Sequence, residues 1–323
     1  MSLPRLLNRY RPLIIEGLAE ALQGASLLHE MLRYHMGLDN KSDMGKLLRP
    51  SLLLFVTEEL GGDPEHALPA AVGLEFVHNF SLIHDDIQDR DHERRGRATV
   101  WSVYGIEQAI NAGDLLHSIA MTQVLRANHG DSTLALLCAQ ELVEAIAEMI
   151  EGQGLDLSFE REEIDIDSYM EMIDKKTGAL IRCALQLGAL SAGASTEISH
   201  RLKELGKYLG RAFQIRDDIL GIWGEPAHTG KPVGNDLLRK KNSYPLAWAK
   251  GQDPGLQELF RHDPVPTEEI LSRLETTGAR TAAAERVASF SKRTQKLKEG
   301  LPFSPDGHND MEELLSFLTE RRI

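Results

Sequence analysis

The chain has 323 residues, of which 42% are hydrophobic and 26% are charged, a balance typical of a globular protein. This composition excludes collagen-like, disordered and disulfide-scaffold proteins. Asp and Glu outnumber Lys and Arg by 49 to 36, and the net charge of −13 argues against nucleic acid as a main partner. An aromatic content of 6% favours helices over a β-sandwich.

The N-terminal segment carries no targeting signal that we recognise. Residues 1–13 place three arginines between leucines and prolines and lack the apolar core of a secretory signal. No stretch approaches 18 uncharged apolar residues, so we expect no membrane span. Cys138 and Cys183 lie among apolar residues, which is typical of reduced, buried thiols. The sequence therefore predicts a cytoplasmic protein.

Apolar residues recur at spacings of three and four along nearly the whole chain, which predicts helices. The pattern opens within residues 6–36 and closes within residues 311–323. Between them, longer helices are predicted over residues 69–88, 106–127, 134–151, 168–192 and 197–223. Gly and Pro cluster in the intervening segments, which we interpret as loops rather than domain boundaries. With no alternating strand pattern, the sequence predicts an all-α protein, one large helical bundle forming a single domain over residues 1–323.

The sharpest motif is the acidic run Asp85-Asp86-Ile87-Gln88-Asp89. On a helix, Asp85 and Asp89 lie one turn apart on the same face, where like charges repel unless a cation lies between them. Carboxylate oxygens of this kind suit Mg²⁺, which shares its shell with substrate phosphates. A solvated acidic helix end is the alternative, but this run ends an apolar helix. A second acidic pair, Asp217-Asp218, ends another long helix.

Basic residues gather near both acidic runs. They are Lys46, Arg49, Arg94, Arg95, Lys176, Lys231, Lys240 and Lys241. Each group alone is more typical of a surface ion pair. Together with the acidic pairs, they favour a substrate with more than one phosphate group, bound by Arg as a planar clamp and by Lys as a point charge.

On these motifs, from about residue 46 to residue 245, the chain resembles the trans-isoprenyl diphosphate synthases, or polyprenyl synthetases, of the short-chain geranylgeranyl type. The family motifs GKxxRP, DDxxD, RRG, KTG and FQxxDD are matched in order by residues 45–50, 85–89, 94–96, 176–178 and 213–218. The resemblance implies the isoprenoid synthase fold with a central active-site cavity, isopentenyl diphosphate and an allylic diphosphate as substrates, and a homodimer.

The resemblance also implies a role for each matched residue. The diphosphate of isopentenyl diphosphate is assigned to Lys46, Arg49, His78 and Arg95. Mg²⁺, at three ions per active site with substrate bound, is assigned to Asp85, Asp89 and Asp217. The allylic diphosphate is assigned to Arg94, Lys176 and Lys231, with Lys241 nearby, and the developing carbocation to Thr177 and Gln214. The chemistry is consistent with these roles, because cleavage of the allylic C–O bond creates a carbocation and a pyrophosphate that needs positive charge.

Two positions depart from the family pattern. Gly221 stands where the second acidic motif usually ends in Asp, and Asn235 replaces a Lys in the later GKxxGKD motif. The first change leaves Asp217, the residue expected to touch the metal. We therefore expect Gly221→Asp to be tolerated.

Product length depends on the residues before the first acidic motif. Phe80 and Ser81 precede Asp85 by five and four positions, and in the family bulk here forms the floor of the pocket. One aromatic residue resembles the geranylgeranyl (C20) pattern, with farnesyl (C15) as the alternative.

Two other functions have less support from the motifs. A terpene cyclase needs only one diphosphate site, and a non-catalytic partner subunit has no need of both acidic clusters.

Overall fold

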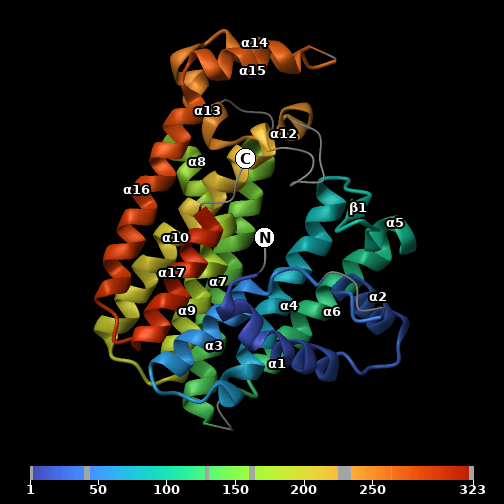
Figure 1. The fold of residues 1–323 in the computed structure, drawn as a ribbon. Helices are drawn as coiled ribbons and strands as arrows, with labels where there is room; N and C mark the ends of the chain where they lie inside the picture. The colour runs from blue at the N-terminus through green and yellow to red at the C-terminus, as the bar shows by residue number, and fades with distance from the viewer. Residues whose placement is uncertain are drawn as a thin grey trace. The chain divides into compact units, whose positions relative to one another are not determined.

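The computed structural model describes residues 3–39, 44–127, 131–159, 164–224, 234–262 and 264–319, and within these ranges helices dominate (Figure 1). The predicted all-α class is confirmed. The chain groups into two compact units, each described by itself below. The first unit comprises Met1–Ile146, Cys183–Leu202 and Pro302–Asp310, and the second comprises Ala147–Arg182, Lys203–Leu301 and Met311–Ile323. The single-domain assignment stays a prediction.

The helices follow the chain from blue to red in Figure 1. The early ones are α1 Arg5–Ala21, α2 Leu27–Met36, α3 Leu48–Glu59, α4 Pro64–Gln88, α5 Val100–Tyr104 and α6 Ile106–Val124. The middle ones are α7 Ser132–Phe159, α8 Ile166–Ile173, α9 Ala179–Ser191 and α10 Thr196–Trp223. The late ones are α12 Asn235–Leu238, α13 Tyr244–Gln252, α14 Leu256–Leu259, α15 Thr267–Thr276, α16 Ala279–Glu299 and α17 Pro305–Thr319.

Helix α4 lies in the core of the first unit. Its N-terminus is capped by Asp63, whose Oδ1 accepts from the Glu65 N–H at 2.9 Å, and Pro64 occupies the first helical turn. Apolar residues face both α3 and α6, so the helix is buried on more than one side. Gly73 allows α6 to approach closely, because a Cβ there would lie 2.6 Å from Val124 Cγ2. This burial brings the first acidic motif to the end of a rigid element.

A short β-hairpin, with two residues in each strand, follows α4, although the sequence predicts no strand. Strands β1 (Glu93–Arg94) and β2 (Arg97–Ala98) pair antiparallel, with Arg94 opposite Arg97. The turn residues Arg95 and Gly96 have φ of 52° and 72°, which is the geometry of a type I′ turn. The RRG motif is therefore a tight turn that presents Arg95 at its tip, and Gly96 is needed there because φ is positive.

The second unit has a core of apolar and aromatic side chains. Ile215 and Ile219 of α10 pack with Tyr169 of α8 and Tyr244 of α13. The helix predicted over residues 168–192 is interrupted by a π-helical turn, η2 (Asp174–Gly178), between α8 and α9. Such turns frequently mark functional sites, and this one carries the KTG motif. The predicted ends at residues 88 and 223 are confirmed.

Two further sequence expectations concern single features. Cys138 and Cys183 are both buried, as predicted. Over the described ranges, every helix is too short or too polar to cross a membrane. The cytoplasmic location stays a prediction.

Candidate active site

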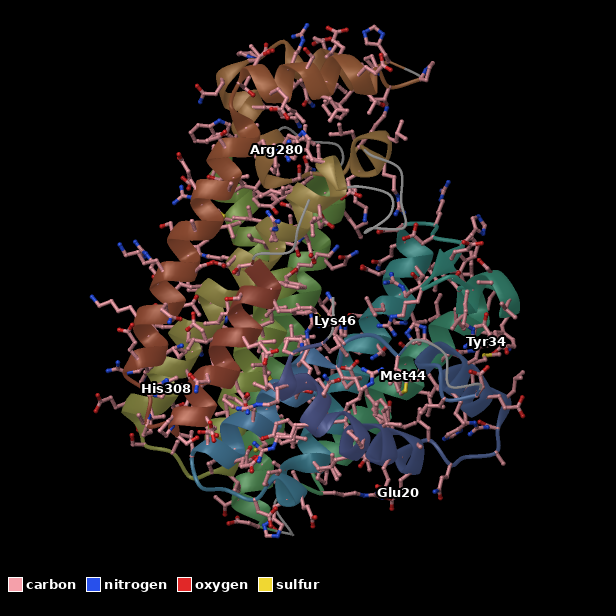
Figure 2. All side chains as sticks on the ribbon, viewed as in Figure 1. Glu20, Tyr34, Met44, Lys46, Arg280 and His308 are labelled. Carbon is pink, nitrogen blue, oxygen red and sulfur yellow. The ribbon has the colours of Figure 1, made fainter. Side chains whose placement is uncertain are left out.

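The GKxxRP motif forms a strained turn that leads into α3. Gly45 has φ of 73° and Leu47 has φ of 51°, so two of three successive residues are left-handed. A Cβ at Gly45 would lie 2.7 Å from a terminal nitrogen of Arg95, and Arg11 Nη1 donates to the Gly45 carbonyl at 2.7 Å. Glycine thus lets the guanidinium of Arg95 pack against this turn. Lys46 follows directly, on the segment into α3 (Figure 2).

Arginines surround His78 on α4. Burial, followed by the charges of Arg49, Arg95 and Arg94, holds the pKa of His78 well below its usual value. The imidazole is therefore neutral, and its ring can donate a hydrogen bond to a phosphate without carrying charge itself. Arg49 and Arg95, which the sequence analysis assigned to the same diphosphate as His78, lie close enough to act on it, and so does Arg94, which was assigned to the other diphosphate. A cluster of this charge is suited to an anion.

A buried polar cluster that the sequence analysis missed supports these cations. Glu75 is 3% exposed, and Asn79 Nδ2 donates to its carbonyl at 2.8 Å and to its Oε1 at 2.9 Å. Burial raises the pKa of Glu75, although Arg49 and the Asn79 hydrogen bond oppose the rise. The only sequence signal is that polar residues interrupt an otherwise apolar helix at spacings of three and four.

His35 of α2 belongs to the same cluster. Its ring hydrogen-bonds Asn79, and burial together with Arg94 and Arg95 lowers its pKa to about 3. Within the described part of the chain, its buried Nε2 has no hydrogen-bond partner. His35 and Asp86 line a cavity of about 20 Å³, which holds about one water molecule.

We expect the free energy of unfolding to fall as the pH drops below 6.5, because His35 stays neutral when folded but takes up a proton when unfolded. This contribution is lost progressively between pH 6.5 and about pH 3, at up to roughly 1.4 kcal/mol per pH unit. Urea titrations at two pH values measure this loss of stability.

The control is His35→Leu, which has no ring to titrate. This variant should lose less stability on acidification than the wild type. The raised pKa of Glu75 acts in the opposite direction in both proteins. An equal loss in both would contradict the prediction.

The two aspartates that open the first acidic motif differ in their surroundings. Asp86 is 1% exposed, and its Oδ1 accepts from both Nε and Nη2 of Arg94 at 2.7 Å. Burial raises the pKa of Asp86, and the Arg94 pair opposes this rise. Asp86 thus holds Arg94 in place, whereas Asp85 and Asp89 are half-buried. The second aspartate therefore has a structural role that the motif does not reveal.

Asp85 and Asp89 fit a divalent cation. Both lie at the C-terminal end of α4, where the helix dipole disfavours negative charge and favours a cation. Among the described residues, no three His, Cys, Asp or Glu side chains are arranged to hold a metal ion by themselves. The pair therefore suits an ion that brings water and phosphate ligands with it, as Mg²⁺ does.

The second acidic motif repeats this division within the second unit. Asp218 is 6% exposed and accepts hydrogen bonds from the Tyr169 hydroxyl, from the Tyr244 N–H at 2.9 Å and from Gln214 Nε2 at 3.1 Å. Burial raises its pKa to about 7 although these bonds oppose the rise. Asp217, one residue earlier, is half-buried. The residue predicted to bind metal is again the first of the pair.

Asp218 also positions the two residues predicted to lie beside the carbocation. Thr177 Oγ1 donates to Gln214 Oε1 at 2.7 Å, and Gln214 in turn donates to Asp218. The π-helical turn that carries Thr177 packs closely on α7, because a Cβ at Gly152 would lie 2.2 Å from the Lys176 nitrogen. Thr177 and Gln214 are thus brought together, as the sequence predicted.

The remaining lysines assigned to the allylic diphosphate differ in their surroundings. Lys176 Nζ donates to Asp156 Oδ2 at 2.5 Å, a partner that the sequence did not reveal. Lys241 is half-buried, and its N–H donates to the Asp236 carbonyl at 3.0 Å. Lys231 lies outside the described residues, as does the side chain of Asn235.

The structure shows what Gly221→Asp has to accommodate, and its expected tolerance stays a prediction. A Cβ at Gly221 would lie only 1.9 Å from Asp236 Oδ2. Any side chain at position 221 therefore has to displace a carboxylate. An added aspartate also brings a second negative charge next to the first.

Phe80 and Ser81 lie near the C-terminal end of α4. Phe80 is 6% exposed and packs edge-on against His84 and against His117 of α6, with ring centroids 5.8 and 5.2 Å apart. Ser81 Oγ donates to the His78 carbonyl at 2.7 Å, so its side chain folds back on the helix. Phe80 is therefore the bulky member of the pair.

A family model described as polyprenyl synthetase matches residues 14–275. A relative from Mycobacterium bovis, (2E,6E)-farnesyl diphosphate synthase, is 40% identical over 228 residues, which is 68% of this chain and 63% of the relative. The chain thus spans less than two thirds of that relative's length. Geranylfarnesyl diphosphate synthase from Aeropyrum pernix is 37% identical over 86% of this chain and 90% of its own.

The fold is also similar to a solved structure. Geranylgeranyl pyrophosphate synthetase from Pyrococcus horikoshii superposes with a TM-score of 0.90 at 35% identity, covering 98% of both chains. These three similar proteins are named for three different product lengths.

Proposed function

Because the chain belongs to the polyprenyl synthetase family, we propose that it is a Mg²⁺-dependent prenyltransferase. It condenses isopentenyl diphosphate head-to-tail with an allylic diphosphate and releases pyrophosphate. The allylic C–O bond breaks, a new C–C bond forms to the double bond of isopentenyl diphosphate, and one proton is lost. No protein nucleophile takes part.

The observation that carries this proposal is the cation cluster around the RRG hairpin. Arg49 and Arg95 act electrostatically on His78, and Arg95 packs against the strained Gly45 turn. We assign the diphosphate of isopentenyl diphosphate to these residues and to Lys46. A protein that binds only one diphosphate has no use for this cluster in addition to an acidic motif, which argues against a terpene cyclase.

In this proposal, Asp85, Asp89 and Asp217 would hold three Mg²⁺ ions when the allylic diphosphate is bound. Bound Mg²⁺ supplies the positive charge that stabilises the leaving pyrophosphate. Arg94, fixed by Asp86, adds a further donor to the same group, and Lys176, Lys231 and Lys241 complete it. Breaking the Lys176–Asp156 pair frees an ammonium for the phosphate.

Thr177 and Gln214 are assigned to the allylic carbon. Gln214 donates one amide hydrogen to Asp218 and accepts from Thr177, so its dipole is fixed by hydrogen bonds. Preorganised oxygen atoms stabilise a developing cation without reorganising during the reaction. The positioning of these two side chains by Asp218 is the reason that the second acidic motif has two aspartates.

The direct test is incubation of the purified protein with labelled isopentenyl diphosphate and dimethylallyl, geranyl or farnesyl diphosphate. Label should enter a longer prenyl diphosphate, and pyrophosphate should be released in equal amount. A terpene cyclase converts the allylic substrate without incorporating label, and a non-catalytic subunit does neither. Either of these results contradicts the proposed function.

We further propose that the main product is geranylgeranyl diphosphate (C20), with farnesyl diphosphate (C15) as the alternative. The support is the single aromatic residue, Phe80, packed beside His84 and His117 near the end of α4. Ser81 adds no bulk at the next position.

We propose that the chain forms a homodimer through α6 and α7. Leu136, Val143 and Ile150 of α7 are 64%, 50% and 54% exposed and recur every seven residues, which aligns them along one helical face. Ile106 and Ile110 of α6 are also exposed. Side chains of this kind are more typical of a protein interface than of a solvated surface.

Light scattering should therefore report a dimer for the wild type and a monomer for the double variant Leu136→Glu/Val143→Glu, because two charges cannot be buried in an apolar interface. Leu238→Glu is the matched control, since Leu238 is 51% exposed on α12, outside α6 and α7. A dimer that survives the double substitution contradicts this choice of surface.

A further inference from the structure

The π-helical turn η2, which carries Lys176 and Thr177, begins at Asp174 and is bound there by two arginines. Arg211 of α10 donates from Nε and Nη2 to the two oxygens of the Asp174 carboxylate, the first at 2.7 Å. Arg182 of α9 donates from Nη1 to the Asp174 backbone carbonyl at 2.9 Å. One helix thus holds the first residue of the turn through its side chain, and another holds it through its backbone.

The geometry of these bonds differs from that of an ordinary surface ion pair. Asp174, Arg182 and Arg211 are all half-buried. The Arg211 pair is bidentate, which fixes the orientation of both groups as well as their separation. Arg182 also pairs with Glu148 of α7, so its guanidinium connects α7 with the turn. The two arginines therefore restrain the start of η2 more than isolated surface charges do.

Gly178, the last residue of the turn, leaves the space that the Arg182 side chain occupies. A Cβ at Gly178 would lie 2.9 Å from Arg182 Nη1, the atom that donates to Asp174. A methyl group there would displace the guanidinium, because the end of an arginine side chain moves more easily than the helix backbone. The course of the Arg182 side chain thus accounts for the glycine that follows Thr177.

The backbones of two further helices pack closely against the turn. A Cβ at Gly152 of α7 would lie 2.2 Å from the Lys176 nitrogen, and a Cβ at Gly210 of α10 would lie 3.0 Å from the Gly178 Cα. Contacts this close leave little room for the turn to shift. Its start is held by the arginines and its other faces by these glycine contacts.

The register of the turn decides where Thr177 points. In a π-helical turn each hydrogen bond spans five residues instead of the four of an α-helix. Reversion to the α-helical register would therefore rotate the side chains beyond the change by one residue, or about 100°. Such a rotation would move Thr177 Oγ1 away from Gln214 Oε1, to which it donates at 2.7 Å.

We propose that Arg182 and Arg211 are positioning residues that hold η2 in its π-helical register and thereby keep Thr177 bound to Gln214. This inference rests on the proposed function, which assigns Thr177 and Gln214 to the allylic carbon. In this role both arginines act through Asp174, so they affect the rate of the reaction without binding isopentenyl diphosphate. The sequence analysis singled out neither of them.

The test compares the wild type with Arg182→Met and Arg211→Met, which keep an apolar stem and remove the hydrogen-bond donors. Lys175→Met is the matched control, because Lys175 lies on the same turn but pairs with the exposed side chains of Glu151 and Glu171. Steady-state kinetics measure kcat for condensation and KM for isopentenyl diphosphate. Hydrogen–deuterium exchange of the substrate-free proteins, read by mass spectrometry, measures the opening of η2.

We expect each of the two arginine variants to lower kcat on the order of tenfold, because a small displacement of a positioned side chain slows the reaction. KM for isopentenyl diphosphate should stay within about twofold of the wild-type value, since interactions made only in the transition state act on kcat. The amides of η2 should exchange faster in both variants. Lys175→Met should keep the wild-type kcat and exchange, and Arg182→Lys, which retains one charged donor, should recover part of kcat.

Gly178→Ala tests the Arg182 contact from the other side. In the wild-type background this variant should lower kcat by a factor similar to that of Arg182→Met. In the Arg182→Met background it should add little, because the guanidinium that the methyl group displaces is already absent. Losses that multiply in the double variant contradict the proposal.

Arginine variants that melt at a lower temperature but keep the wild-type kcat and exchange overturn the proposal, because both residues then contribute to stability alone. If Arg182→Met fails to fold, Arg182→Lys must show faster exchange in η2 and a lower kcat, and wild-type values in that variant overturn the proposal. A wild type that does not condense its substrates refutes the proposed function. An active wild type with unaffected arginine variants refutes this inference alone.

Discussion

Replacing Asp85 with alanine should lower kcat for condensation by on the order of 10²-fold or more. The leaving pyrophosphate carries its negative charge only in the transition state, so a lost metal ligand acts mainly on kcat. Asp85 is half-buried at the C-terminal end of α4, four residues before Asp89, and no second pair of carboxylates follows on that helix. Removal of Mg²⁺ with EDTA should abolish the reaction in the wild type.

The matched control for this experiment is Asp91→Ala. Asp91 lies in the same acidic segment but outside the motif, and its backbone carbonyl accepts hydrogen bonds from Thr99 and Trp101, which alanine at this position keeps. We expect this variant to retain activity within a few-fold of the wild type. Near-normal turnover by Asp85→Ala contradicts the assignment of Asp85 to the metal.

Replacing Phe80 with alanine should shift the product distribution from C20 to C25 and longer. Phe80 lies five residues before Asp85, or about 7.5 Å along the helix at 1.5 Å per residue. Its ring is 6% exposed and packs edge-on against His84 and His117, so close packing restricts its movement. Alanine removes the ring and leaves the residues of the acidic motif unchanged. Chromatography of the dephosphorylated products measures the shift.

Phe76 provides the control on the same helical face. It lies one turn further from the acidic motif and is fully buried. Phe76→Leu alone should leave the product length unchanged, because the chain meets Phe80 first. In the Phe80→Ala background, the same change should lengthen the product again. An active, folded Phe80→Ala enzyme with unchanged products places the pocket floor elsewhere.

The spacing of apolar residues was sufficient to locate the long helices. The predicted ends at residues 88 and 223 agree with α4 and α10, because each helix stops where its apolar period stops. The predicted helix over residues 168–192 was less accurate. Its period continues through the π-helical turn, which changes the register by only one residue and leaves no mark on the composition.

The motifs also determined most of the chemistry by residue type. Acidic residues four apart, with Lys and Arg in nearby segments, predict metal ions and phosphates whatever the details of the fold. Arg49 and Arg95 lie close enough to His78 to lower its pKa, and Arg95 also packs against the Gly45 turn. A short-range pattern was enough here because each motif is local to a single turn or helix end.

Only the tertiary structure decided which member of each acidic pair is buried and holds other side chains. Asp86 and Asp218 look equivalent to Asp85 and Asp217 in the sequence, yet both are buried and hold other side chains. Their partners, such as Tyr169, come from distant segments.

Contacts between distant segments are also the reason that the sequence did not reveal the places of His35 and Asp236. His35 reaches Asn79 from another helix, and Asp236 fills the space beside Gly221. Periodicity and motif spacing report the residues within one element. Hydrogen bonds and close contacts between elements are set by packing, so the sequence by itself predicted the residue types of the site and the folded chain determined which of those residues are buried and what they hold.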